Sequence, residues 1–484
     1  MSETASPPAA RIPWLIQGGM GIGISNWSLA RAVSSAGQLG VVSGTAIDNV
    51  FARRLQDQGV DDTLRAVLDR FPVPSVVDEA VRRFAAVRRR ASAPYKNLLM
   101  LTNPGQRRSI DLIVLASFVE VALAKAGHGG LIGINLLTKV QLPTAATLCG
   151  AILAGVDYVL MGAGVPTHIP GVLGDLAAGQ AVNLPLSVTG ATSDADVAVD
   201  HFDPSPYLGS TALTRPGFLG IVSSHVLATA LAKRSNGPVD GFVVERPTAG
   251  GHNAPPRGHF EVDGHGNPVY GERDEVDFNV LAQLAKPFWI AGGITSAEHV
   301  RQALAVGAAG VQVGTLFAFC DESGMDPDLR RRVISQVKTG SVSVKTSLRA
   351  SSTGYPFKIA EVSGTIAEAR VYEERERKCD LGYLREAYVK SDGSVGYRCA
   401  AEPVSAHLRK GGVIEDTVGS ACLCNGLMAT CGLGQVRSDG RLEPPIVTSG
   451  DCINDIAQLL VNRDGYRARD VVDHLDPARV GATA

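Results

Sequence analysis

Short apolar runs alternate with segments of helical periodicity along most of the chain, and this alternation limits the fold more than any other feature. Each run ends in glycine or a polar turn, as expected for strands of a parallel sheet that helices cover. The candidate strands are Ile12–Ile16, Gly40–Val42, Leu131–Leu136, Tyr158–Met161, Leu184–Val188, Gly241–Val244, Pro287–Ile290 and Gly310–Val313. This pattern predicts an α/β fold, specifically a (β/α)8 TIM barrel. A doubly wound open sheet remains the alternative.

The length of the chain exceeds what a barrel alone requires. A TIM barrel takes roughly 250 residues, whereas the chain has 484. We therefore expect a barrel over residues 11–325 with insertions at about 49–130 and 202–239. Beyond the last candidate strand, charged sequence punctuated by glycine and proline replaces the alternation, so we predict a C-terminal appendage that contains cysteines over residues 326–484.

The charge balance argues against nucleic acid and membranes as partners. The 46 Lys and Arg residues nearly match the 48 Asp and Glu residues, and no long basic block occurs. No run approaches the ~20 apolar residues of a membrane span. The polar segment Met1–Ala10 lacks the pattern of a secretory signal. These features predict a cytoplasmic protein with reduced thiols.

Glycine turns follow the first, seventh and eighth candidate strands. In Gln17–Gly23, backbone amides could approach a flat cofactor, although a tight βα turn has the same sequence pattern. Ala291–Ile294 and Gln312–Thr315 stand where barrels often build a phosphate site from loop amides and a helix N-terminus. Both could instead be close-packed turns. Two correctly placed turns rarely coincide by accident, so we predict a phosphate site.

A histidine lies at the expected mouth of the barrel. His252 follows the sixth candidate strand, within the segment Glu245–Asn253. With an ordinary pKa of about 6.5, a histidine there could take a proton from a carbon acid or bind an anionic substrate. The alternative is a structural histidine that caps a loop. Its position beside two glycines on the reactive face favours a catalytic role for His252.

Taken in order, the motifs resemble those of the nitronate monooxygenases, formerly called 2-nitropropane dioxygenases. The resemblance covers about residues 11–325 and rests on Gly18–Met20, Gly133–Leu136, Asp157–Pro166, Ala249–His252, Ala291–Ile294 and Gln312–Thr315. It implies a non-covalently bound FMN, with His252 as catalytic base or substrate anchor. It also implies that the enzyme oxidises an alkyl nitronate with O2 to a carbonyl compound and nitrite.

The resemblance and the glycine turns together give a set of cofactor-binding residues. Residues 18–20 are expected near the isoalloxazine ring, residue 135 near its polar edge, and the turns after the last two strands at the phosphate. The full set is Gly18, Gly19, Met20, Asn135, Gly250, Gly251, Ala291, Gly292, Gly293, Gln312, Gly314 and Thr315.

Two departures from the family pattern leave the substrate open. Short members lack a tail of this length, and many carry Glu where Thr248 stands. The chain also resembles the trans-acting FMN enoyl reductases of polyunsaturated fatty acid and polyketide synthases, which reduce a carrier-bound enoyl thioester with NAD(P)H. A third alternative is a non-catalytic scaffold in a biosynthetic complex. If the chain is an enzyme of either kind, we expect a small-molecule substrate, O2 or NAD(P)H as co-substrate, and a homo-oligomer.

The cysteines of the tail raise the question of a metal. Cys379, Cys399, Cys422, Cys424 and Cys431 could supply thiolates to zinc or an iron–sulfur cluster. However, the sequence has no paired C-x2-C knuckles, and buried free cysteine behaves as a small hydrophobe. We therefore predict no metal site.

Overall fold

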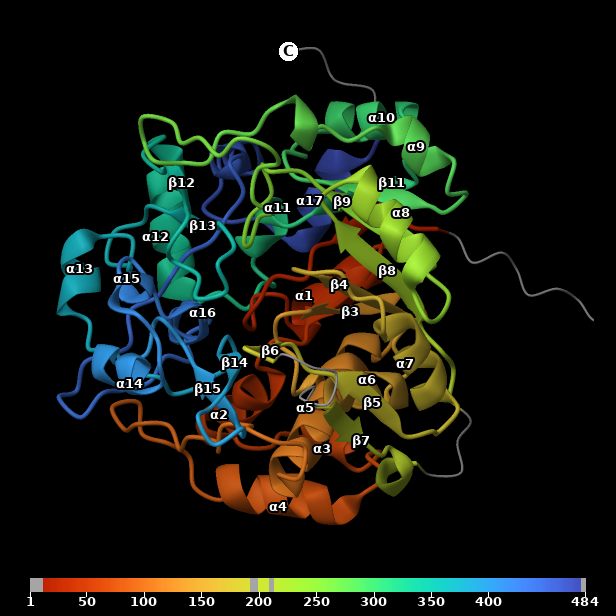
Figure 1. Ribbon diagram of the computed structural model, residues 1–484. Helices are drawn as coiled ribbons and strands as arrows, with labels where there is room; N and C mark the ends of the chain where they lie inside the picture. Colours follow the sequence, from red (N-terminus) through yellow and green to blue (C-terminus); the bar gives the residue numbers. More distant parts are fainter. Residues whose placement is uncertain (1–11, 192–198, 209–212, 480–484) are drawn as a thin grey trace, which may run out of the picture.

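The computed structural model describes residues 12–191, 199–208 and 213–479, so the polar segment 1–11 lies outside the described residues. Its main sheet contains 8 strands, in the order β1-β11-β10-β9-β8-β4-β3-β2, and every pairing is parallel. Their bounds are β1 (Leu15–Gln17), β2 (Gly40–Ser43), β3 (Ile132–Leu137), β4 (Tyr158–Gly162), β8 (Gly217–Val222), β9 (Gly241–Glu245), β10 (Phe288–Ala291) and β11 (Gly310–Val313). A parallel bridge between Ile16 and Leu39 joins the two edges. The predicted TIM barrel is confirmed (Figure 1).

Helices cover the outside of the barrel. They are α1 (Trp27–Ser35), α5 (Arg107–Lys125), α6 (Thr144–Leu153), α7 (Ile169–Ala177), α8 (His225–Arg234), α9 (Phe278–Ala282), α10 (Ala297–Ala305), α11 (Thr315–Ala318) and α17 (Ala468–Leu475). Several begin at a side-chain cap: Asn26 accepts from the Leu29 amide, and Ser224 and Ser296 cap α8 and α10 in the same way. Near the end of the chain, α17 packs against α1 and α10 and so completes the outer ring (Figure 1).

One predicted strand is wrong. The run 184–188 does not enter the barrel: β5 (Val182–Pro185) pairs with β7 (Val199–Phe202) and β6 (Val188–Thr189) with a tail strand. The residues of β5 alternate between buried and exposed, which is typical of a strand with one solvent-facing side. The fifth barrel strand is β8, inside the segment 202–239 that we expected to be an insertion. The expectation failed because Gly217 and Gly220 interrupt the apolar run of β8.

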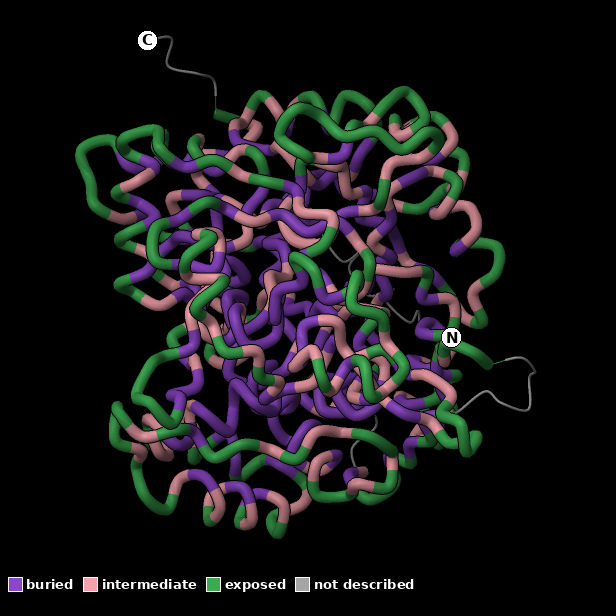
Figure 2. Tube along the Cα trace, turned by 60° about the vertical axis from the view of Figure 1, so that its left-hand side comes forward, coloured by how far each residue is buried: buried purple, intermediate pink, exposed green. Residues whose placement is uncertain are grey.

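The barrel interior is filled by side chains. Ile16, Val41, Leu160, Leu219 and Trp289 belong to a core cluster of residues that point inward from different strands. The Trp289 indole N–H donates to the Pro13 carbonyl oxygen at 2.8 Å, so its polar atom is satisfied. Figure 2 shows the buried trace running through the centre of the molecule. The barrel below the carboxyl ends of its strands is therefore a packed core, so a ligand can bind only at the mouth formed by those carboxyl ends.

The segment between β2 and β3 is helical before it reaches α5. It contains α2 (Ile47–Gln58), α3 (Asp62–Leu68) and α4 (Pro74–Phe84). The α2 helix lies beside α5, and both contribute to the large core cluster outside the barrel. Within the residues that the structure describes, no helix is long and apolar enough to cross a membrane.

The C-terminal residues fold against the barrel. Their elements are α12 (Pro327–Lys338), β12 (Val344–Ser347), β13 (Phe357–Ala360), α13 (Ala369–Glu374), β14 (Glu386–Val389), β15 (Val395–Arg398), α14 (Val404–Arg409), α15 (Ile414–Thr417), α16 (Leu423–Thr430) and η4 (Ile453–Leu459). Ile22 and Val50, from the loop after β1 and from α2, share one core cluster with Phe357, Met428 and Ile446. The tail therefore covers one side of the barrel with an apolar contact (Figure 1).

Candidate active site

A large cavity lies at the carboxyl ends of the barrel strands. Its empty volume is about 1590 Å³, including the part that opens to solvent, so a ligand of cofactor size fits. The structure brings all the predicted site residues to this one cavity. Its lining includes Gly18, Gly19, Met20, Asn135, Gly250, Gly251, His252, Ala291, Gly292, Gly293, Gln312, Gly314 and Thr315. The convergence follows from the fold, because parallel strands end at the same mouth.

Two side-chain amides present unused acceptors at the floor of the cavity. Asn135 comes from β3, and its Nδ2 donates to the Gly19 carbonyl oxygen at 3.0 Å. Asn135 Oδ1 and Gln312 Oε1 are buried and have no hydrogen-bond partner among the described residues. Because buried polar atoms are nearly always paired, these two acceptors fit the N–H groups of a bound ligand.

The glycine turns leave room only for backbone. A Cβ on Gly19 would lie 2.1 Å from Asn135 Cβ, and a Cβ on Gly292 would lie 2.8 Å from Thr248 Oγ1. Gly292 and Gly293 also have positive φ values of 94° and 71°, which disfavour any other residue.

Three residues of these turns have backbone amides without an acceptor. Gly293, Ile294 and Gly314 line the cavity, and none of their amides donates to an acceptor within the described parts of the chain. The first two follow β10 and the third follows β11. The arrangement suits a phosphate group, which accepts several backbone N–H bonds at once.

A loop of the tail is bound to the same turns. The Gly450 amide donates to Thr315 Oγ1 at 3.0 Å, and the Asp451 amide donates to the Thr248 carbonyl oxygen at 3.1 Å. The loop 448–451 therefore forms one wall of the cavity. This wall was not foreseen from the sequence, because residues more than a hundred positions apart meet there and no local pattern signals the contact.

His252 is held by the tail. Its Nε2 lies 2.7 Å from Ser351 Oγ, which in turn lies 2.7 Å from Thr353 Oγ1. The ring of Phe357 packs edge-on with its centroid 4.9 Å from that of the imidazole. Burial lowers the pKa of His252 to about 4, so the imidazole is neutral at neutral pH. His252 can therefore exchange hydrogen bonds with a ligand but brings no positive charge.

Glu245 is a site residue that the sequence reasoning missed. It ends β9, lines the cavity, and has no ion-pair or hydrogen-bond partner for its carboxyl group among the residues described. Burial raises its pKa to about 7. The signal was available: an acidic residue ends an otherwise apolar strand whose carboxyl end faces the barrel mouth.

The cavity has little positive charge. Of the described residues that line it, none is Lys or Arg. The nearby Arg246 uses its Nη2 to donate to the Gly292 carbonyl oxygen at 2.6 Å, and it thereby supports the phosphate-type turn from outside. A neutral ligand group would consequently meet less electrostatic cost beside Glu245 than an anionic one.

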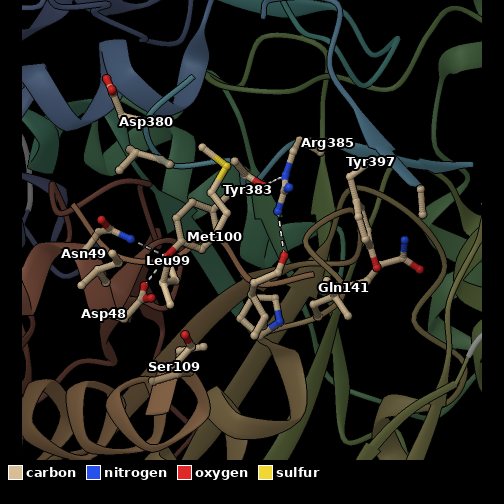
Figure 3. Close-up of a pocket in the computed structure, with 18 of the residues that line it drawn as sticks. Asp48, Asn49, Leu99, Met100, Ser109, Gln141, Asp380, Tyr383, Arg385 and Tyr397 are labelled. Atoms are coloured by element: carbon tan, nitrogen blue, oxygen red, sulfur yellow. Dashed lines mark hydrogen bonds between the residues drawn. The ribbon is translucent and has the colours of Figure 1, made fainter. Parts of the chain in front are cut away.

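A second, smaller cavity (Figure 3) shares Tyr383 with the first. Its empty volume is about 690 Å³, and apolar residues such as Met100 form much of its wall. The Tyr383 hydroxyl donates to Asp48 and accepts from Asn49 Nδ2, the latter at 2.8 Å. Arg385 fixes another part of the wall through its bond to the Leu101 carbonyl oxygen at 2.7 Å. The side chain of Tyr383 thus forms the partition between the two cavities.

The tail cysteines are not arranged as a metal centre. Cys422 and Cys424 are buried, and burial raises the pKa of Cys424 to about 12 and that of Cys379 to about 11. Over the described ranges, no group of three or more His, Cys, Asp or Glu side chains could hold a metal ion. The thiols therefore contribute to the apolar packing between tail and barrel, and Cys424 also lines the main cavity.

The fold and the cavity together define a TIM-barrel protein with a cofactor-sized site at the carboxyl mouth of its strands. Comparison with known sequences adds a similarity to one family. The model of the nitronate monooxygenase family matches residues 186–397, a range that includes His252 and both glycine turns after β10 and β11. Over this range the chain is similar to the nitronate monooxygenase family.

Two curated relatives and one solved structure illustrate how similar the chain is to known proteins. Nitronate monooxygenase of Paraburkholderia phytofirmans is 30% identical over 167 residues, which cover 33% of this chain and 42% of that protein. Nitronate monooxygenase of Pseudomonas aeruginosa is 30% identical over 154 residues, 32% of this chain and 40% of that protein. The chain thus matches only about two fifths of these relatives' length.

The solved structure is the enoyl reductase domain of MlnA from the macrolactin biosynthesis cluster of Bacillus amyloliquefaciens. It is 10% identical, with a TM-score of 0.48 and coverage of 96% of this chain and 93% of that one. A likeness at this level bears on no residue of the site.

Proposed function

We propose that the chain is an FMN-dependent oxidoreductase that uses NAD(P)H to reduce the C=C bond of an activated alkene, such as an enoyl compound. The observation that carries this proposal is the chemistry of the cavity wall. A half-buried carboxyl group and a neutral imidazole line it, and no Lys or Arg does so among the described residues. These groups suit a neutral, polarised substrate better than an anion such as a nitronate.

The residues of the cavity fit FMN. The amides of Gly293, Ile294 and Gly314 would hold its phosphate. Asn135 Oδ1 and Gln312 Oε1 are unpaired acceptors that would receive N–H groups at the polar edge of the ring. When bound, FMN would supply hydride transfer between NAD(P)H and the substrate.

The protein's own contribution is to polarise and orient the alkene. Ser351 engages Nε2 of His252 at 2.7 Å, which leaves Nδ1 for the carbonyl group that activates the alkene. A hydrogen bond to that carbonyl oxygen stabilises the negative charge that develops there when a hydride adds to the β-carbon. Residues 448–450 of the tail line the cavity and would limit the access of water to a bound substrate. The second cavity beyond Tyr383 offers room for the remainder of a larger substrate.

The test follows the flavin absorbance of the purified protein under anaerobic conditions. NADH or NADPH should bleach the flavin, and trans-2-hexenal or an N-acetylcysteamine enoyl thioester should then restore its colour. The saturated analogue serves as the control and should have no effect. Reduced flavin that no enal, enone or enoyl thioester reoxidises would contradict the proposal.

A second candidate function is the oxidation of alkyl nitronates with O2. The observation that favours it is the family match, which spans residues 186–397 and thus includes His252. Anaerobic mixing with propyl-1-nitronate or propyl-2-nitronate should then bleach the flavin directly, and air should yield nitrite. Absence of bleaching across a panel of nitronates would remove this candidate. Protein that takes up no flavin at all would instead support a non-catalytic scaffold.

A further inference from the structure

Glu245 occupies the position on the barrel where a catalytic group is expected. It is the last residue of β9 and pairs in register with Ala291 of β10, which directly precedes the Gly292–Gly293 turn. On the other side of Ala291, the register continues to Gln312 of β11. Glu245 and Gln312 both line the main cavity. The carboxyl group therefore belongs to the same polar ring as the acceptors that would contact the flavin.

The charged and titratable groups around Glu245 leave its carboxyl group without a partner. Arg246, its neighbour in sequence, directs its guanidinium to the Gly292 carbonyl oxygen. The other titratable groups that line the cavity, within the described residues, are His252, Tyr383, Cys424 and Cys452. Among the residues that the structure describes, no ion pair or hydrogen bond links any of these groups to the Glu245 carboxyl.

Each of these other groups is a poor proton donor at neutral pH. The neutral imidazole of His252 has already lost the proton that it could give, because burial lowers its pKa to about 4. Tyr383 donates its hydroxyl proton to Asp48 on the far side of the partition, and burial raises its pKa well above the usual value. Burial also raises the pKa of both thiols, Cys424 and Cys452. Glu245 is the group with a proton to give, since burial raises its pKa to about 7.

We propose that Glu245 is the proton donor in the alkene reduction, an inference that rests on the function proposed above. A hydride with its electron pair, derived from NAD(P)H, forms the new C–H bond at the β-carbon. The π electrons of the alkene move toward the α-carbon and its carbonyl group, and the α-carbon then takes the proton of the Glu245 carboxyl group. The resulting carboxylate regains a proton from water. NAD(P)H is oxidised and the C=C bond is reduced to C–C.

The experiment separates the two halves of the reaction in the FMN-loaded full-length protein. Glu245→Gln keeps the size of the side chain but has no acidic proton. We expect unchanged FMN content and unchanged bleaching by NADPH, whereas reoxidation by the enoyl thioester should slow by about 10²–10⁴-fold. Glu245→Asp should retain part of the rate, and Glu272→Gln, an exposed carboxyl elsewhere, should behave as wild type.

The pH dependence supplies a second readout. In the wild type the reoxidation rate should fall as pH rises through about 7, because the carboxyl group then loses its proton; in Glu245→Gln this fall should disappear. A Glu245→Gln protein that reoxidises at the wild-type rate overturns the inference alone. Wild-type reduced flavin that no alkene reoxidises overturns the proposed function and the donor role together. If Glu245→Gln does not fold, a Glu245→Asp protein with an unaltered rate and pH profile overturns the inference.

Discussion

Replacement of Glu245 by Gln should stabilise the folded protein, and increasingly so as pH rises. Burial raises the pKa of this carboxyl group from its ordinary value of 4.5 to about 7 in the folded state. The folded state therefore binds the proton more tightly than the unfolded state does. The resulting contribution to stability is fully present below about pH 4.5 and is lost as pH rises through 7. Gln has no such proton, so the variant escapes the loss.

The magnitude follows from the two pKa values. Each unit of pKa difference is worth about 1.4 kcal/mol. The free energy of unfolding of the variant minus that of wild type should therefore be roughly 3 kcal/mol larger at pH 8 than at pH 4. At pH 5 this difference in the free energy of unfolding should be only about 1 kcal/mol larger than at pH 4. Because bound ligand adds its own stabilisation, the comparison uses flavin-free protein.

The assay is urea unfolding of wild type, Glu245→Gln and the surface control Glu272→Gln at pH 5, 6, 7 and 8. The difference between wild type and Glu245→Gln should widen with pH, whereas the control should stay parallel to wild type. A difference that is constant over this range, or one that shrinks as pH rises, would refute the raised pKa of the Glu245 carboxyl group at the barrel mouth.

Two further predictions concern the cofactor turn and the histidine. Gly19→Ala would place a Cβ 2.1 Å from Asn135 Cβ, an overlap that typically costs about 1–3 kcal/mol. The purified variant should therefore hold markedly less FMN. The control Gly264→Ala, whose Cβ would have nothing within 4 Å, should hold as much FMN as wild type. Ser351→Ala removes the hydrogen bond to His252, worth about 0.5–1.5 kcal/mol, and should lower kcat for the alkene with unchanged FMN content; an unaltered kcat would show that this bond does not serve the reaction.

Sequence reasoning predicted the parts of the site that depend on local pattern. Gly18, Gly292 and Gly314 each follow a buried strand, and the carboxyl ends of parallel strands meet, so their convergence at one cavity followed once the barrel was predicted. The fifth strand was misplaced because Gly217 and Gly220 interrupt the apolar run of β8. The run 184–188, which was predicted in its place, is divided between two small separate sheets.

The parts that escaped prediction depend on contacts between distant segments. Ser351 reaches His252 across 99 positions, and Thr315 receives the Gly450 amide across 135 positions. Local periodicity carries no information about such pairs. Glu245 differs from these, because its place at the end of a barrel strand was visible in the sequence; only the burial that isolates its carboxyl group required the structure.

FMN binding at the barrel mouth is tested most directly by the absorbance spectrum of the purified full-length protein. We expect flavin absorption bands and, after denaturation, release of about one FMN per chain, since one cavity contains both the glycine turns after β10 and β11 and the unpaired amide acceptors. Flavin-free protein should regain the bands with FMN and bind riboflavin, which lacks the phosphate, much more weakly. Colourless protein that stays colourless after incubation with FMN would contradict the claim.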